Sequence, residues 1–178
     1  MYANPRSFNG FLAVALMVLS LGCQTTDPKP KPDRSKRKEL STLRFCLETN
    51  PDGTERTKIV SVLRNSPVSI CVETTPVLNE NDIAEASVVE AQGIFDIRIK
   101  LNTRGTRLLE MVSGTSQGQR LAVFSQFGPE RWLAAPKLTH LISDGIFEFA
   151  PDASREEADR IVRGLNNLVA QMKKRNKF

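Results

Sequence analysis

The chain has 178 residues with a formal net charge of +5, and 40% of them are hydrophobic. This is enough for one globular domain with a real core, so folding requires neither disulfides nor metal ions. Basic chains often bind nucleic acid, but one tryptophan and one tyrosine leave no aromatic platform for stacking bases. We therefore expect no nucleic-acid partner.

The amino-terminal residues have the pattern of a secretory signal. Arg6 precedes a charge-free apolar run at 11–21. That run is shorter than the roughly 20 apolar residues that span a bilayer, but it suits the core of a signal peptide. It ends at Gly22 and Cys23, which resembles the lipobox of bacterial lipoproteins. The resemblance implies removal of residues 1–22 and acylation of Cys23. An ordinary signal peptide or an uncleaved anchor is the alternative.

Residues 23–39 are expected to tether the domain to the bilayer through acylated Cys23. From Gln24 to Glu39 there is no aliphatic or aromatic side chain, so the segment cannot bury enough apolar surface to fold. Its six basic and three acidic residues either keep it soluble or attract anionic lipid head groups. We expect a cell-envelope location facing the periplasm, and Gln24 after the cysteine favours the outer over the inner membrane.

A folded domain is expected over residues 40–172, with a basic tail at 173–178. Three strand-like runs open it, and turns rich in Asn, Pro, Ser and Gly separate them. The runs are Thr42 to Glu48, Thr57 to Leu63, and Val68 to Thr74.

Cys46 and Cys71 are the thiols that remain after acylation. Strand alternation places each on the polar face of its strand. An exported protein meets an oxidising compartment, so the two can pair, but only if their Cα atoms come within about 7 Å. The sequence leaves this disulfide open, since the run from Thr57 to Leu63 could lie between them.

In the middle of the domain, the pattern of apolar residues predicts a short helix and then another strand. The stretch from Pro76 to Ala86 is predicted to begin a short helix, with Asn79 or Asn81 as its cap. The run at 95–101 alternates between apolar and polar side chains, which is typical of an antiparallel sheet with one buried and one solvent-exposed face. Its side chains expected to be buried are Phe95, Ile97, Ile99 and Leu101, and Arg98 and Lys100 are among those expected to be exposed to solvent.

The remaining elements complete an α+β plan. A helix is predicted from Thr103 to about Val112, then two strands around Gly128-Pro129, then a short strand at 145–149. Ser154 and Glu157 form a capping box for a final amphipathic helix, in which Gly164 allows close packing. The apolar stripe of this helix is Ala158, Ile161, Val162, Leu165, Leu168, Val169 and Met172. We expect an antiparallel β-sheet with two or three helices on one face.

Short motifs follow one another in a recognisable order from Pro76 to about Leu168. They are Pro76-Val77-Leu78 with Asp82 and Ile83, Leu101 with Gly105, Gly118 with Arg120-Leu121-Ala122, Ala135-Pro136, Gly145 with Phe147, and Glu156-Glu157-Ala158. This order resembles the head subdomain of the first periplasmic domain of SecD, a membrane subunit of the Sec export machinery. The resemblance implies that fold and contact with exported chains. SecD proteins also carry several transmembrane helices, whereas we expect none in this sequence after Cys23. The resemblance therefore does not imply a proton-driven motor.

No pattern in the sequence declares a reaction. His140 is the single histidine, and Ser143 and Asp144 are near it only along the chain, whereas a triad converges in space. The thiols lack the spacing of metal ligands. We expect no catalytic residue, cofactor or metal.

Two classes of function stay open. One is a binding module for exported or envelope proteins, acting near the Sec exit. The other is a structural or assembly lipoprotein with a fixed partner unrelated to export. A sheet covered on one face leaves an open strand edge that can capture an extended peptide, unless charges such as Arg98 and Lys100 block it.

Overall fold

The computed structural model describes residues 39–91 and 93–175. The predicted signal peptide at 1–22, the acylation site Cys23 and the tether up to residue 38 lie outside the described residues. None of the helices in the described part of the chain is long and apolar enough to cross a lipid bilayer.

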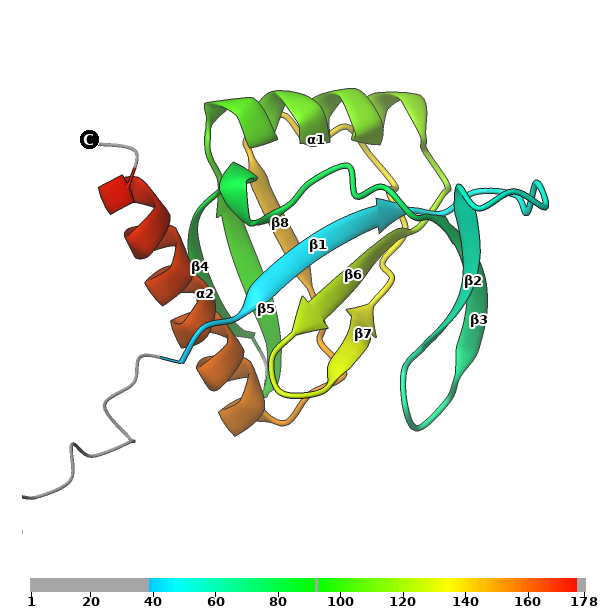
Figure 1. Ribbon diagram of the computed structural model, residues 1–178. Coiled ribbons are helices and arrows are strands. Elements are labelled where there is room, and N and C mark those ends of the chain that lie inside the picture. Colours follow the sequence, from blue (N-terminus) through cyan, green and yellow to red (C-terminus); the bar gives the residue numbers. More distant parts are fainter. Residues whose placement is uncertain (1–38, 92, 176–178) are drawn as a thin grey trace, which may run out of the picture. The chain divides into compact units, whose positions relative to one another are not determined.

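Eight strands in the described part of the chain form three antiparallel sheets (Figure 1). The β6 sheet has the order β1-β6-β7, and the β5 sheet has the order β4-β5-β8. Strands β2 and β3 pair as a separate hairpin. The bounds are β1 Thr42–Leu47, β2 Thr57–Val62, β3 Val68–Glu73, β4 Ile83–Ala91, β5 Ile94–Leu101, β6 Leu121–Gln126, β7 Glu130–Ala134 and β8 Ile146–Phe149.

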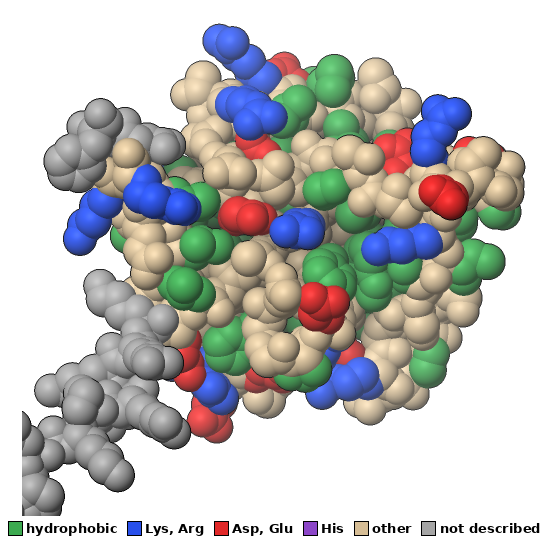
Figure 2. Space-filling view, in the orientation of Figure 1, with side chains coloured by type: hydrophobic (Ala, Val, Ile, Leu, Met, Phe, Trp, Pro, Cys, Tyr) green, Lys and Arg blue, Asp and Glu red, His purple; other side chains and the backbone are tan. Residues whose placement is uncertain are grey.

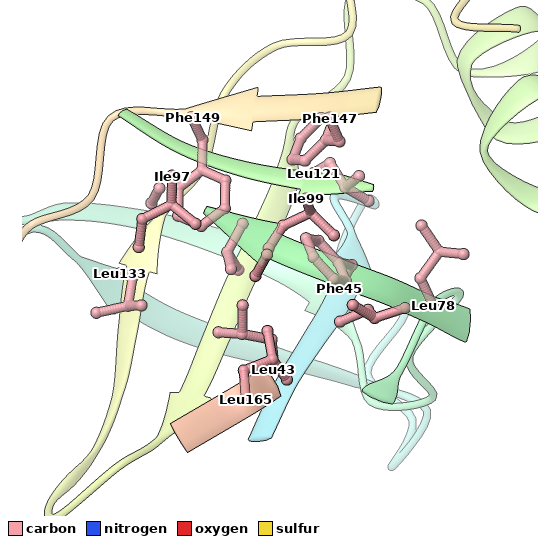
Figure 3. Packing of buried hydrophobic residues seen from close by; sticks show 14 of the residues in the cluster. Leu43, Phe45, Leu78, Ile97, Ile99, Leu121, Leu133, Phe147, Phe149 and Leu165 are labelled. Carbon is pink, nitrogen blue, oxygen red and sulfur yellow. The ribbon is translucent and has the colours of Figure 1, made fainter. Parts of the chain in front are cut away.

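The main core lies between the β6 sheet and the β5 sheet (Figure 3). The rings of Phe45 and Phe147 meet edge to face across it, with centroids 5.7 Å apart. Ile97 and Ile99 are fully buried, whereas Arg98 and Lys100 between them are exposed. The predicted buried and solvent-exposed faces of this strand are therefore confirmed.

Two helices border this pair of sheets on different sides (Figure 1). Helix α1 (Thr103–Thr115) begins at Asn102, whose side chain accepts a hydrogen bond from the Gly105 N–H. A Cβ at Gly105 would lie 2.6 Å from the Asp82 carbonyl oxygen, so this position requires glycine. Helix α2 (Arg155–Arg175) buries most of the predicted apolar stripe, with Leu168 and Met172 half-buried, and Gly164 packs directly on Ser41 before β1.

The structure corrects two expectations about this architecture. The α+β class with two helices is confirmed, but the strands divide among three sheets instead of joining one, and the helices border different sides of the paired sheets instead of sharing one face (Figure 1). The stretch at 76–86 is not the start of a helix: Glu80–Asp82 forms a single 3-10 turn, and strand β4 follows at once. Asn79 does cap that turn, as predicted, in a capping box with Asp82. The apolar alternation after residue 82 lets β4 pair with β5, so strand pairing outweighs the local helix signal.

The hairpin explains a third correction, which concerns Cys46. We expected this thiol on a polar face, but it is 4% exposed. The β2–β3 hairpin covers that face of the β6 sheet and forms a second core with Cys46, Val60, Val62, Ile70, Val72 and Ala122. Burial raises the pKa of the Cys46 thiol.

Candidate protein-binding edges

The outer edge of β4 is closed by helix α2. The side chain of Asn166 acts like a neighbouring strand toward Ala86: its Oδ1 accepts from the Ala86 N–H at 2.9 Å, and its Nδ2 donates to the Ala86 carbonyl at 2.8 Å. Further along, Lys173 Nζ donates to the Ala84 carbonyl at 3.1 Å. An incoming peptide strand cannot reach these backbone groups without displacing α2.

Three other strand edges are also occupied. On β1, the Phe45 N–H donates to the Leu78 carbonyl at 2.9 Å, and the Phe45 carbonyl accepts from Val77. On β7, the Leu133 carbonyl accepts from the Asp152 N–H at 2.7 Å. On β3, the Cys71 carbonyl accepts from the Thr49 N–H at 2.9 Å. The chain therefore protects these edges with its own connecting segments.

The outer edge of β8 is open in the described structure. The Leu101 N–H donates to the Gly145 carbonyl, which fixes the alternation of the β5–β8 ladder. Residues of an antiparallel pair alternate between bonded and non-bonded positions, so the backbone of Ile146 and Glu148 points away from β5. The Ile146 N–H is taken by Asp144 Oδ1 at 2.9 Å. The Ile146 carbonyl and both backbone groups of Glu148 therefore remain available.

A groove of about 310 Å³ runs beside this open edge. Its far wall is the segment 136–142, which connects β7 to β8, and includes the buried Leu138 and the half-buried Ile142. Its lining combines these apolar side chains with Lys137, His140 and Asp144. A strand edge beside a partly apolar groove has the features needed to hold an extended peptide by its main chain. We call this region the β8 groove.

Charges on the outer face of the β5 sheet do not cover the groove. Arg98 Nε donates to Glu148 Oε1 at 2.6 Å, so the two opposite charges satisfy each other across neighbouring strands. Ile146, 37% exposed, lies opposite Lys100 on the same face. The expectation that Arg98 and Lys100 could block a strand edge therefore does not hold at β8, because both lie on the central strand β5.

The largest group of charged side chains in the described residues fastens the hairpin to the domain. Asp152 Oδ2 accepts from the Arg64 N–H at 2.8 Å and from Arg64 Nε at 3.2 Å. Arg131 donates to the Asp152 carbonyl and also pairs with Glu157. Two guanidinium groups and two carboxylates balance in charge here, which is the arrangement of a structural clasp. Glu157 thus uses its carboxylate on Arg131, while its N–H donates to Ser154 as the predicted cap requires.

The amino-terminal end of the described domain, Glu39, is fixed by helix α2. Arg160 donates to Glu39 Oε1 at 2.7 Å, and Asn167 donates to the Glu39 carbonyl at 3.1 Å. The hydrogen bond from Arg160 lowers the pKa of the Glu39 carboxyl. Glu39, the first described residue, is therefore held against helix α2 by these two hydrogen bonds.

The residues singled out in the sequence do not converge. His140 is exposed in the loop wall of the β8 groove, with its Nδ1 3.1 Å from the Thr139 hydroxyl. Asp144 bonds backbone instead of histidine. Cys46 and Cys71 are both free, and their side chains lie on opposite faces of the hairpin, since Cys71 alternates with the inward Ile70 and Val72. Among the described residues no cluster of His, Cys, Asp and Glu could hold a metal ion.

No protein-family model matches the chain, and no curated protein is similar to it in sequence. Solved structures do match. One is a SecDF described as a membrane component that enhances protein export: TM-score 0.52, 19% identity, covering 72% of this chain and 63% of that one. Another is SecDF in a super-membrane-facing form: TM-score 0.53, 19% identity, covering 72% of this chain and 19% of that one. The described domain therefore has a SecD-like fold, as predicted, and the chain spans less than two thirds of either SecDF chain.

Proposed function

Starting from this SecD-like fold, we propose that the protein is a non-catalytic binding protein of the cell envelope that captures extended segments of exported or envelope proteins at the β8 groove. The observation that carries the proposal is the open edge of β8. At four other edges the chain's own groups bond to backbone groups of the outer strand, whereas the described residues supply no partner for the N–H and carbonyl of Glu148 beside the groove.

The expected affinity follows from the three backbone groups of β8 that can form hydrogen bonds with a bound peptide. Three hydrogen bonds to Ile146 and Glu148 contribute roughly 2 to 4 kcal/mol in total. Micromolar affinity corresponds to about 8 kcal/mol, so apolar contacts in the groove must supply about half or more of it. Binding of this kind is reversible and tolerant of sequence, because the main chain is common to all partners. These properties suit a partner that is still unfolded.

The link to protein export rests on the shared fold. The matched SecDF is described as enhancing export, and we infer that this chain acts on the same kind of partner near the exit of the Sec channel. A lipid anchor at Cys23, with the tether up to Glu39, would hold the domain at the membrane. Mass spectrometry of the native amino terminus tests the anchor: an acylated cysteine is expected, and cleavage at another residue would contradict it.

The β8 groove is tested with two substitutions at one position. Glu148→Pro removes the outward N–H without removing a ladder bond to β5, whereas Glu148→Gln keeps the N–H and loses only the charge. Both variants lose the ion pair with Arg98, so that loss cancels in the comparison. We expect Glu148→Pro to weaken binding of urea-unfolded envelope proteins by at least tenfold, and Glu148→Gln to bind like the original chain.

Two outcomes would count against the proposal. Equal binding by both variants would exclude the β8 edge. Binding of a single folded envelope protein, with none of the unfolded ones bound at micromolar concentration, would favour the assembly lipoprotein with a fixed partner. Should Glu148→Pro prove unstable, Ile142→Lys provides a second variant, because it places a charge in the apolar wall of the groove opposite β8 without altering the backbone of the strand.

A further inference from the structure

A second feature outside the β8 groove lies at the margin of the hairpin core, against which Trp132 packs. The rings of Phe124 and Trp132 pack together on the outer face of the β6 sheet, with centroids 5.2 Å apart. Both side chains are half-buried. The Nζ of Lys58 lies 5.2 Å from the Trp132 ring centroid and 6.0 Å from that of Phe124. Figure 2 shows hydrophobic, basic and acidic side chains next to one another on one face of the molecule.

The hairpin leaves these rings only partly covered. It buries Cys46 and Ala122, and the rings lie along its β2 side, where Lys58 reaches over them. Trp132 packs on one side against the apolar hairpin core, and the part of the aromatic pair that lies under the lysine ammonium stays accessible.

The edge of β2 beside these rings is open. The Thr74 N–H donates to the Arg56 carbonyl, which fixes the alternation of the β2–β3 ladder. The backbone of Ile59 and Ser61 therefore points away from β3. The described residues supply no hydrogen-bond partner for these groups, and the Ile59 side chain is 73% exposed. A strand could add here as the third strand of the hairpin.

The charged side chains near the rings are mainly basic, and one acidic side chain, Glu130, shares the face of Trp132 on β7, where its Oε1 accepts from Gln126 Nε2 at 2.8 Å. Lys58 lies over the rings, and Arg44, 47% exposed, projects from the same outer face of the β6 sheet. Arg44 has a distant partner, Glu80, at 3.8 Å, whereas no carboxylate among the described residues forms an ion pair with Lys58. A bound segment that supplies a carboxylate would complement this surface.

We propose that the β2 edge, with Lys58, Phe124 and Trp132, is a second binding surface, for an extended protein segment that carries an acidic and an apolar side chain two residues apart. Side chains two apart in a strand share one face. When the segment pairs with β2, one such face points toward the rings: the apolar side chain contacts Phe124 and Trp132, and the carboxylate pairs with Lys58. The segment's main chain bonds the free groups of Ile59 and Ser61.

Trp132 is the single tryptophan of the chain, so its fluorescence reports binding directly. The probes are two extended peptides, Thr-Val-Thr-Glu-Thr-Val-Thr and the same sequence with Lys in place of Glu. We expect the full chain, in a mild detergent, to show a saturable change in Trp132 emission with the Glu peptide at least fivefold tighter than with the Lys peptide. Added salt should reduce the difference.

Charge reversal gives the sharper result. Lys58→Glu should invert the preference toward the Lys peptide, and Lys58→Gln should abolish it. Lys100→Glu, on the outer face of the β5 sheet, is the matched control and should leave the preference unchanged. The proposal is overturned if Lys58→Glu keeps the original preference, or if neither peptide changes the emission. Glu148→Pro must leave the emission change intact, so failure of this surface and failure of the β8 groove are separable.

Discussion

Replacing Asn166 should expose how the domain closes the edge of β4. In Asn166→Ala, the N–H and carbonyl of Ala86 lose their partners at 2.9 and 2.8 Å. Ala86 is 4% exposed, so its backbone is poorly placed to bond water instead. Each orphaned group costs about 1 to 3 kcal/mol. Alanine returns at most roughly 0.7 kcal/mol through its helix propensity. The free energy of unfolding should therefore fall by about 1 to 5 kcal/mol.

The neighbouring Asn167 provides the matched control. Its side chain donates to the Glu39 carbonyl at 3.1 Å in an exposed position, so Asn167→Ala should change stability by less than about 1 kcal/mol. Urea unfolding of both variants measures the difference, and hydrogen exchange should show faster exchange of the Ala86 amide in Asn166→Ala alone. Equal stabilities for the two variants would refute the idea that Asn166 substitutes for a neighbouring strand.

Three further predictions follow from burial and hydrogen bonding. Ile97→Asp should lower the free energy of unfolding by several kcal/mol, because a carboxylate would enter the core unpaired, whereas Lys100→Asp should have little effect in the same urea titration. Without denaturant a thiol reagent should modify Cys71 faster than Cys46, whose thiol is buried and has a raised pKa; equal rates would contradict the packing of the hairpin. Hydrogen bonds from Thr54 and Thr57 lower the pKa of Asp52 from 3.8 to about 2. Because this folded-state pKa is depressed, its contribution to stability is present above about pH 4 and is lost as the pH falls toward 2. An NMR titration of the Asp52 side chain with a midpoint near 4 would disprove it.

The sequence predicted the elements whose periodicity is strong and local. The alternation around Ile97 and Ile99 identified a strand and its buried side. The stripe through Ile161 and Leu165 identified the long final helix. In these segments one face is apolar enough for burial to decide the structure without help from distant residues.

The errors arose where tertiary contacts decide. Asn79 and Asp82 do form a capping box, but the helix that such a box promises ends after one turn, because β4 pairs with β5. Cys46 was assigned to a polar face because the alternation of β1 cannot show that a hairpin nearby in sequence folds over it.

The open edge of β8 could not be derived from the sequence. It depends on which backbone groups of the other edge strands are already bonded. Asn166, Asp152 and Leu78 form those bonds to β4, β7 and β1 from distant positions in the sequence. A signal for Asn166 did exist: it lies four residues after Val162 and three before Val169, so it is a polar residue within the buried side of α2. A polar side chain at such a position requires a partner, although the sequence does not say which.

Hydrogen exchange at the Glu148 amide tests the proposed binding mode most directly. This N–H points away from β5 in the free protein and should exchange quickly. Adding an unfolded envelope protein at saturating concentration should slow its exchange at least tenfold, because the bound main chain accepts from it. Binding that leaves the exchange of Glu148 unchanged would contradict capture at the β8 edge.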